Sequence, residues 1–117
     1  MTVLDYIEVQ NRKIAIDGDG YLVNYDDWNK SVADALAERE NNGKITDEKL
    51  AILKFIRWYY KEYNFFPMLS AVCKNVHKPK TCLQEEFYNP LLAWKLAGLP
   101  HPEEPLISLL EAGQSPG

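Results

Sequence analysis

Two thiols are the side chains of this sequence best suited to carry sulfur or a soft metal. Cys73 and Cys82 are the only cysteines among the 117 residues. Cys73 and His77 are four residues apart and would share one face of a helix, so with Cys82 and His101 they make a conceivable tetrahedral zinc set. That spacing matches no familiar zinc pattern. We therefore expect no metal site and no cofactor.

Cys82 is the better candidate for a reactive thiol. It lies at the predicted start of a short helix, after Lys78 and Lys80, and a helix N-terminus and nearby positive charge both lower the pKa of a thiol. Cys73 reads as a small buried hydrophobic residue. An inert thiol is the favoured interpretation of Cys82 as well, and a sulfur carrier using Cys82, or else Cys73, stays open as an alternative.

A basic cluster surrounds the third predicted helix. With the helix before it and the turn over 63–66, this cluster outlines a helix-turn-helix, so a DNA-binding regulator acting through the helix near Lys74 is a further alternative. The net charge of −4 weakens the DNA-binding alternative. A solvated face or a surface for an acidic protein partner is the favoured interpretation of the cluster. The cluster consists of Lys74, His77, Lys78 and Lys80.

Motifs of self-contained catalysis are missing from the sequence. It has no nucleophile elbow, no phosphate-binding glycine loop and no His-Glu helix motif. The run from Asp17 to Gly20 resembles a calcium loop, but position 28, where an EF-hand needs an acidic ligand, is Trp. We interpret it as a tight turn. The chain is not expected to be an enzyme, unless it is a sulfurtransferase-type carrier.

Length and composition indicate one small domain. A chain of 117 residues has room for a single core, and no apolar run approaches the ~20 residues of a membrane span. The first residues lack a basic, apolar signal sequence. Two cysteines are too few for a secreted disulfide scaffold, which predicts reduced thiols in a cytoplasmic protein.

The elements that would position these residues follow from hydrophobic periodicity. Residues 6–9 and 13–16 alternate at period two and predict a β-hairpin, with a short third strand over 21–23. Apolar spacing and caps then predict about five short helices. The first is expected to run from Asp26 to a left-handed cap at Asn41-Asn42-Gly43, and the second from Asp47, after the N-cap Thr46, to about residue 63. The others are expected from Pro67 to about Val76, from Cys82 to Tyr88 and from Pro90 to Gly98.

The second helix, over about 47–63, is predicted to be central. Its apolar residues lie nearly all round the axis, which is typical of a helix buried on several sides. We therefore interpret its aromatic residues as core. After Pro102 the sequence has no further clear helix start and stop signals. We expect one or two amphipathic turns over 106–110 and a frayed end at 114–117.

Three motifs together resemble the DsrC/TusE family, the gamma-subunit-like proteins of dissimilatory sulfite reductase and of the tRNA-thiolation sulfur relay. The run Trp94-Lys95-Leu96-Ala97-Gly98-Leu99-Pro100-His101-Pro102 is similar to the family's K-I-A-G-L-P-K-P. The family's opening motif is similar to Asp19-Gly20-Tyr21-Leu22 followed by Asp27-Trp28. Its central stretch is similar to Phe55-Ile56-Arg57 with Tyr59-Tyr60 and Glu62-Tyr63, then Pro67 and Lys74. The resemblance implies an α+β, mostly α fold, with an N-terminal β-hairpin packed on an orthogonal helix bundle.

The family resemblance also implies a mobile C-terminal arm with a penultimate cysteine and, in many members, a second cysteine upstream. Trp94 and Pro105 occupy those two positions here, so neither can carry sulfur. Ser70 stands where the family often has a basic residue. We expect a single DsrC-like domain over 1–106 and a partly frayed C-terminal extension over 107–117.

The favoured hypothesis is a non-catalytic binding or regulatory protein of sulfur metabolism. Its expected partners are sulfite reductase, sulfur-relay proteins or a second copy of itself, with nucleic acid disfavoured and no membrane involved. The partner-binding residues are predicted to be Lys74, His77, Lys78, Lys80, Lys95 and His101.

Overall fold

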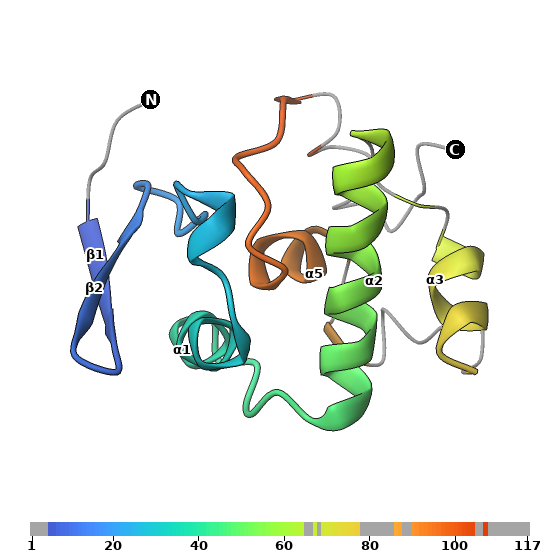
Figure 1. Ribbon diagram of the computed structural model, residues 1–117, viewed down its shortest axis with the longest axis horizontal. Helices are drawn as coiled ribbons and strands as arrows, with labels where there is room; N and C mark the ends of the chain where they lie inside the picture. The colour runs from blue at the N-terminus through green and yellow to red at the C-terminus, as the bar shows by residue number, and fades with distance from the viewer. Residues whose placement is uncertain are drawn as a thin grey trace.

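The computed structural model describes residues 5–64, 67, 69–77, 86–87, 90–104 and 107. A two-stranded hairpin lies at one end, and helices make up most of the rest (Figure 1). This mostly helical α+β arrangement confirms the predicted fold class. The elements are β1 (Asp5–Val9), β2 (Arg12–Ile16), the 3-10 turn η1 (Tyr25–Asp27), α1 (Lys30–Arg39), α2 (Asp47–Tyr63), α3 (Leu69–Asn75) and α5 (Pro90–Leu96).

The hairpin closes through a two-residue turn. Gln10 and Asn11 both have positive φ, 51° and 64°, as a type I′ turn requires to match the twist of the strands. The strands pair antiparallel, with Val9 opposite Arg12. The predicted third strand is reduced to one isolated bridge between Ile16 and Leu22.

Two side-chain caps place the start of the first helix later than predicted. The Asn24 side chain accepts a hydrogen bond from the Asp26 amide and supports only the short η1. The chain then extends, and the Asn29 side chain accepts from the Val32 amide to begin α1 at Lys30. The prediction that this helix begins at Asp26 was therefore wrong, because acidic residues in a first turn also suit an isolated 3-10 turn.

The central helix α2 begins and ends where its sequence predicts. The Thr46 hydroxyl accepts from the Lys49 amide at 3.2 Å, and Asn64 ends the helix in the left-handed conformation. Figure 1 shows α2 standing between α5 and α3, with α1 seen nearly end-on. The most deeply buried large side chains are Ile14, Ile16, Leu22, Leu36, Ile52, Leu53, Ile56, Phe87, Leu96 and Leu99.

The prediction that α2 is buried on several sides was wrong for one face. Ile52, Leu53 and Ile56 are fully buried, whereas Trp58 and Tyr63 are 51% and 60% exposed. The predicted fourth helix, over 82–88, lies outside the described residues except for the helical pair 86–87. The turns predicted over 106–110 also lie outside them, except for Ile107.

Candidate functional site

Residues 96–102, from the last residue of α5 onward, are called here the arm root, and several side chains from elsewhere in the sequence hold them. The last carbonyls of a helix have no partner within the helix and need one from elsewhere. Trp28 Nε1 donates to the Leu96 carbonyl at 2.9 Å, and Arg57 Nη1 donates to the Ala97 carbonyl at 3.0 Å. Two residues far back in the sequence therefore fix where the arm root leaves the helix.

Gly98 allows this close approach. Its φ of +72° lies in the left-handed region, and a Cβ built there would stand 2.4 Å from Trp28 Cδ1 and 3.0 Å from Leu22 Cδ2. Both the backbone conformation and the lack of space exclude a side chain at this position. The glycine of the family-like motif is thus required by the indole packed against it.

Arg57 holds three elements together. Its Nη2 donates to the Tyr25 carbonyl at 3.0 Å, and its guanidinium carbon lies 3.8 Å from the Tyr25 ring centroid and 4.6 Å from that of Trp28. The Tyr25 hydroxyl donates in turn to the Arg57 carbonyl at 3.0 Å. Burial lowers the pKa of Arg57, and the charges of Tyr25 and Asp26 partly offset this. An arginine remains charged under such a shift and can donate to both carbonyls.

Trp94, at one of the two positions that the resemblance assigns to an arm cysteine, is a buried anchor. Its side chain is 3% exposed, and its Nε1 donates to the Pro100 carbonyl at 2.7 Å. Its ring meets Tyr60 edge-on at 5.6 Å. Trp94 therefore ties the arm root to α5 and to α2. Pro105, the other such position, lies outside the described residues.

His101 attaches the end of the arm root to the turn after β2. Its Nε2 lies 2.8 Å from Asp19 Oδ2, and its Nδ1 lies 2.9 Å from the Pro102 carbonyl oxygen. Since both neighbours are acceptors, only the protonated ring can donate to both. The Asp17 side chain accepts from the amides of Asp19 and Tyr21, so the expected tight turn is present and presents Asp19 to the histidine.

The pKa of His101 is raised above its ordinary value. Burial lowers it, but the hydrogen bonds to Asp19 and Pro102 and the charges of Asp17 and Asp19 outweigh that effect. A raised folded-state pKa contributes stability that is complete below the unfolded pKa of about 6.5 and is lost as the pH rises through the folded value.

We expect Asp19→Asn to lower the pKa of His101 and to remove this pH-dependent contribution to stability. An NMR titration of the ring protons of His101 measures the shift, with the signals of His77, which follows α3, as the internal reference. An unchanged His101 titration in Asp19→Asn would contradict the contact.

Cys73 is not a free thiol in this structure. It is fully buried in α3 and disulfide-bonded, in contrast to the reduced thiol expected from the cysteine count. The burial of Cys73 agrees with the expectation that it is a small residue of the core. The other cysteine of the sequence, Cys82, lies outside the described residues.

The structure describes four of the predicted docking residues, Lys74, His77, Lys95 and His101. Lys74 and His77 are exposed at and after the end of α3, and Lys78 and Lys80 lie outside the described residues. Lys95 belongs to α5, on the other side of α2 from α3 (Figure 1). Its Nζ lies 3.5 Å from Glu40 and 4.9 Å from the Tyr21 ring centroid. Lys95 is therefore already occupied within the fold.

Sequence reasoning assigned to the core a set of aromatic residues on α2 that is partly exposed, called here the aromatic stripe. Their spacing of i, i+3, i+4 and i+8 places them on one helical face, and that spacing was the available signal. Neighbouring rings lie in contact, with Tyr59 and Tyr63 centroids 4.6 Å apart. The stripe consists of Phe55, Trp58, Tyr59 and Tyr63.

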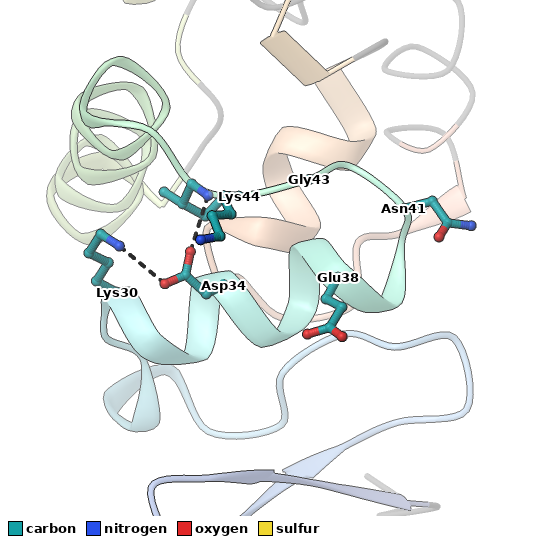
Figure 2. Close-up of a pocket in the computed structure, with 7 residues that line it drawn as sticks. Lys30, Asp34, Glu38, Asn41, Gly43 and Lys44 are labelled. Atoms are coloured by element: carbon teal, nitrogen blue, oxygen red, sulfur yellow. Dashed lines mark hydrogen bonds and ion pairs between the residues drawn. The ribbon is translucent and has the colours of Figure 1, made fainter.

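A hollow of about 710 Å³ lies between α1 and the loop that follows it (Figure 2). Asp34 lines it, and one of its carboxylate oxygens pairs with Lys30 at 3.1 Å while the other accepts from the Ile45 amide. The loop lining residues Lys44 and Gly43 are exposed. Asp34 therefore serves to hold the loop to α1, and the mixed charges of the hollow favour no particular chemistry.

Within the described part of the chain, no three His, Cys, Asp or Glu side chains cluster as metal ligands would. No helix in that part is both long and apolar enough to cross a membrane.

Comparison with known proteins gives a family match over most of the chain. A family model described as "DsrC like protein" matches residues 8–106. Sulfurtransferase TusE of Yersinia pestis is 34% identical over 68 residues, covering 58% of this chain and 62% of that protein. The match thus spans less than two thirds of that relative.

Two other proteins match over longer stretches. The gamma subunit of the dissimilatory-type sulfite reductase of Nitratidesulfovibrio vulgaris is 29% identical over 98 residues, covering 82% of this chain and 93% of that one. The NMR structure of Allochromatium vinosum DsrC superposes with a TM-score of 0.70 at 36% identity, covering 85% and 96% of the two chains. The hairpin and helices described above therefore share the fold of the Allochromatium vinosum DsrC structure.

Proposed function

Because this chain belongs to the DsrC-like family, we propose that it works in sulfur metabolism as a docking or regulatory member that carries no sulfur itself. In this proposal residues 1–106 form the family domain, and residues 107–117 are an extension of it. The protein would meet its partner, a sulfite reductase or a sulfur-relay protein, in the cytoplasm.

The observation that carries the proposal is the environment of Trp94. The resemblance assigns this position to an arm cysteine, whose sulfur must be reachable by a partner. Here the position holds a buried indole that donates to the Pro100 carbonyl at 2.7 Å. Pro105, at the other assigned position, has no thiol either. A side chain that anchors the arm root serves binding rather than sulfur transfer.

The environment of Cys73 supports the same proposal. A thiol that accepts sulfur must be accessible and partly ionised at neutral pH, whereas Cys73 is fully buried and disulfide-bonded. Of the residues proposed for partner binding, Lys74, His77 and His101 have the exposure that docking needs. A homodimer is the alternative assembly.

We expect this protein to take up no sulfur from a persulfide donor. Intact-mass analysis after incubation with the donor tests this on the wild type and on Cys73→Ser and Cys82→Ser, with Yersinia pestis TusE as a positive control. Pro105→Cys is the matched gain-of-function variant, because it restores a thiol at the assigned arm position, and it should gain one sulfur atom.

One result would overturn the proposal in favour of a carrier. A gain of one sulfur atom by the wild type that disappears only in Cys82→Ser would make Cys82 the carrier. Failure of Pro105→Cys to take up sulfur while the positive control does so would show that position 105 is not equivalent to the family's arm cysteine.

A further inference from the structure

The exposed face of α2 carries a projecting ring and a hollow two helical turns apart. The Trp58 side chain is 51% exposed, and the rings of Phe55 and Tyr63 lie beside it. Ala51, seven residues before Trp58, is also exposed and lines a hollow of about 390 Å³ next to the end of α3. Seven residues span about 10.5 Å along a helix and return to the same face. The ring and the hollow are therefore presented in one direction.

The hollow combines an apolar and an acidic lining. Ala51 and the half-buried Val76 supply apolar surface. Asp47 and Glu48 line it from the first turn of α2, and both are exposed. An occupant of suitable chemistry has an apolar ring with a positive charge close beside it.

Trp58 and Lys61 together have this chemistry. Lys61 follows Trp58 by three residues and is thus its neighbour on the helix surface. It is exposed and, among the described residues, makes no ion pair. One molecule cannot place its own Trp58 in its own hollow, because both belong to the same straight helix. A second copy of the chain can do so.

The required register is that of two antiparallel α2 helices. When Trp58 of one copy lies opposite Ala51 of the other, Lys61, three residues further on, lies opposite Glu48, three residues further back, with Asp47 next to it. Charge complementarity thus agrees with the fit of the ring. Antiparallel packing also places unlike ends of the two helix dipoles together.

Two-fold symmetry makes each of these contacts twice. In a symmetric pair, if one residue contacts a second across the interface, the second contacts the first as well. The axis passes between Lys54 and Phe55, so the half-buried Phe55 meets its own copy, while the exposed Lys54 can extend to solvent. A helix of 17 residues offers a contact only about 25 Å long. Such a small interface is typical of a reversible dimer.

We propose that two copies of this chain associate through α2, antiparallel, with Trp58 of each in the hollow beside Ala51 of the other. Tyr60, which packs on Trp94, lies two residues after Trp58 and so points away from the interface. The arm root therefore stays accessible in the dimer. This contact does not depend on the sulfur-related function proposed above, so either one can fail without the other.

Sedimentation equilibrium of the full chain, from micromolar to millimolar concentration, tests the interface. We expect a monomer–dimer equilibrium in the wild type and a dissociation constant at least about tenfold higher in Trp58→Ala, since a buried tryptophan is a typical hot spot. Tyr6→Ala is the matched control, because Tyr6 is an aromatic residue of β1 that is 55% exposed. A wild type that stays monomeric throughout, or equal effects of the two variants, would overturn the proposal.

A mixing experiment tests the register itself. Ala51→Trp fills the hollow, so alone it should dimerise as weakly as Trp58→Ala. In a mixed pair, the Trp58→Ala copy offers an open hollow to the other copy's Trp58 and leaves room for the added tryptophan. Fluorescence anisotropy of Trp58→Ala, labelled at its N-terminus and titrated with Ala51→Trp, should show a mixed dimer at least about tenfold tighter than either variant alone.

Far-UV circular dichroism of both variants confirms that they keep the wild-type helix content. With folding intact, a mixture that associates no better than the separate variants would contradict the placement of Trp58 against Ala51. The dimer of the wild type would then use another surface.

Discussion

Gly98→Ala is expected to lower the free energy of unfolding by about 2–5 kcal/mol. An alanine held at positive φ costs roughly 1–2 kcal/mol, and overpacking a filled site costs roughly 1–3 kcal/mol more. The added methyl group would stand 2.4 Å from Trp28 Cδ1. Relief of that clash requires movement of the indole that holds the Leu96 carbonyl, so the start of the arm root should loosen as well.

Gly43→Ala is the matched control for the clash. Gly43 also has positive φ, +80°, but a Cβ there would have no neighbour within 4 Å. It should show only the backbone part of the loss, about 1–2 kcal/mol. Urea unfolding followed by far-UV circular dichroism measures both variants. Equal losses in the two would contradict the packing of Trp28 against Gly98.

Arg57→Met is expected to cost about 2–4 kcal/mol of stability. It removes two hydrogen bonds from a charged donor, to Ala97 and Tyr25, and the contact of the guanidinium with two aromatic rings. The methionine keeps most of the side-chain length, so the loss reports on the lost polar contacts more than on a cavity. Urea unfolding measures the loss, and amide hydrogen exchange over the arm root should accelerate.

Two control variants test whether the stability loss comes from the shape of the guanidinium, from its charge alone, or from any substitution in α2. Arg57→Lys keeps the charge but cannot reach both carbonyls with a rigid fork, so it should recover only part of the stability. Lys54→Met, at an exposed position of the same helix, should change stability by no more than about 0.5 kcal/mol. Full recovery by Arg57→Lys would show that charge alone holds these elements together.

Several elements of the fold were predictable because their causes are local. The Thr46 hydroxyl caps α2 through the Lys49 amide, three residues away, and the left-handed turn after α1 uses Asn41 and Gly43, at φ +57° and +80°. The late start of α1 was also encoded locally. Asn29 is a good N-cap, but the acidic pair before it masked the signal.

The aromatic residues of α2 show the limit of such reasoning. Tyr60 and Trp58 are two residues apart and equally apolar by type, yet Tyr60 packs on Trp94 and Trp58 is half-exposed. Composition and periodicity indicate only that a residue is apolar enough to be buried. Which face is covered depends on where the neighbouring helices lie, and α3 and α5 leave one face of α2 open.

The sequence by itself determined the central helix, the hairpin and the family resemblance, which implies that Trp94 and Pro105 stand at the arm-cysteine positions. Only the tertiary structure decided what Trp94 does, because its bond to Pro100 depends on the path of the arm root. It also decided that Arg57 reaches Ala97, 40 residues away. Caps and turns are fixed by neighbours within a few residues, whereas the arm root is fixed by side chains that only the packed helices bring together.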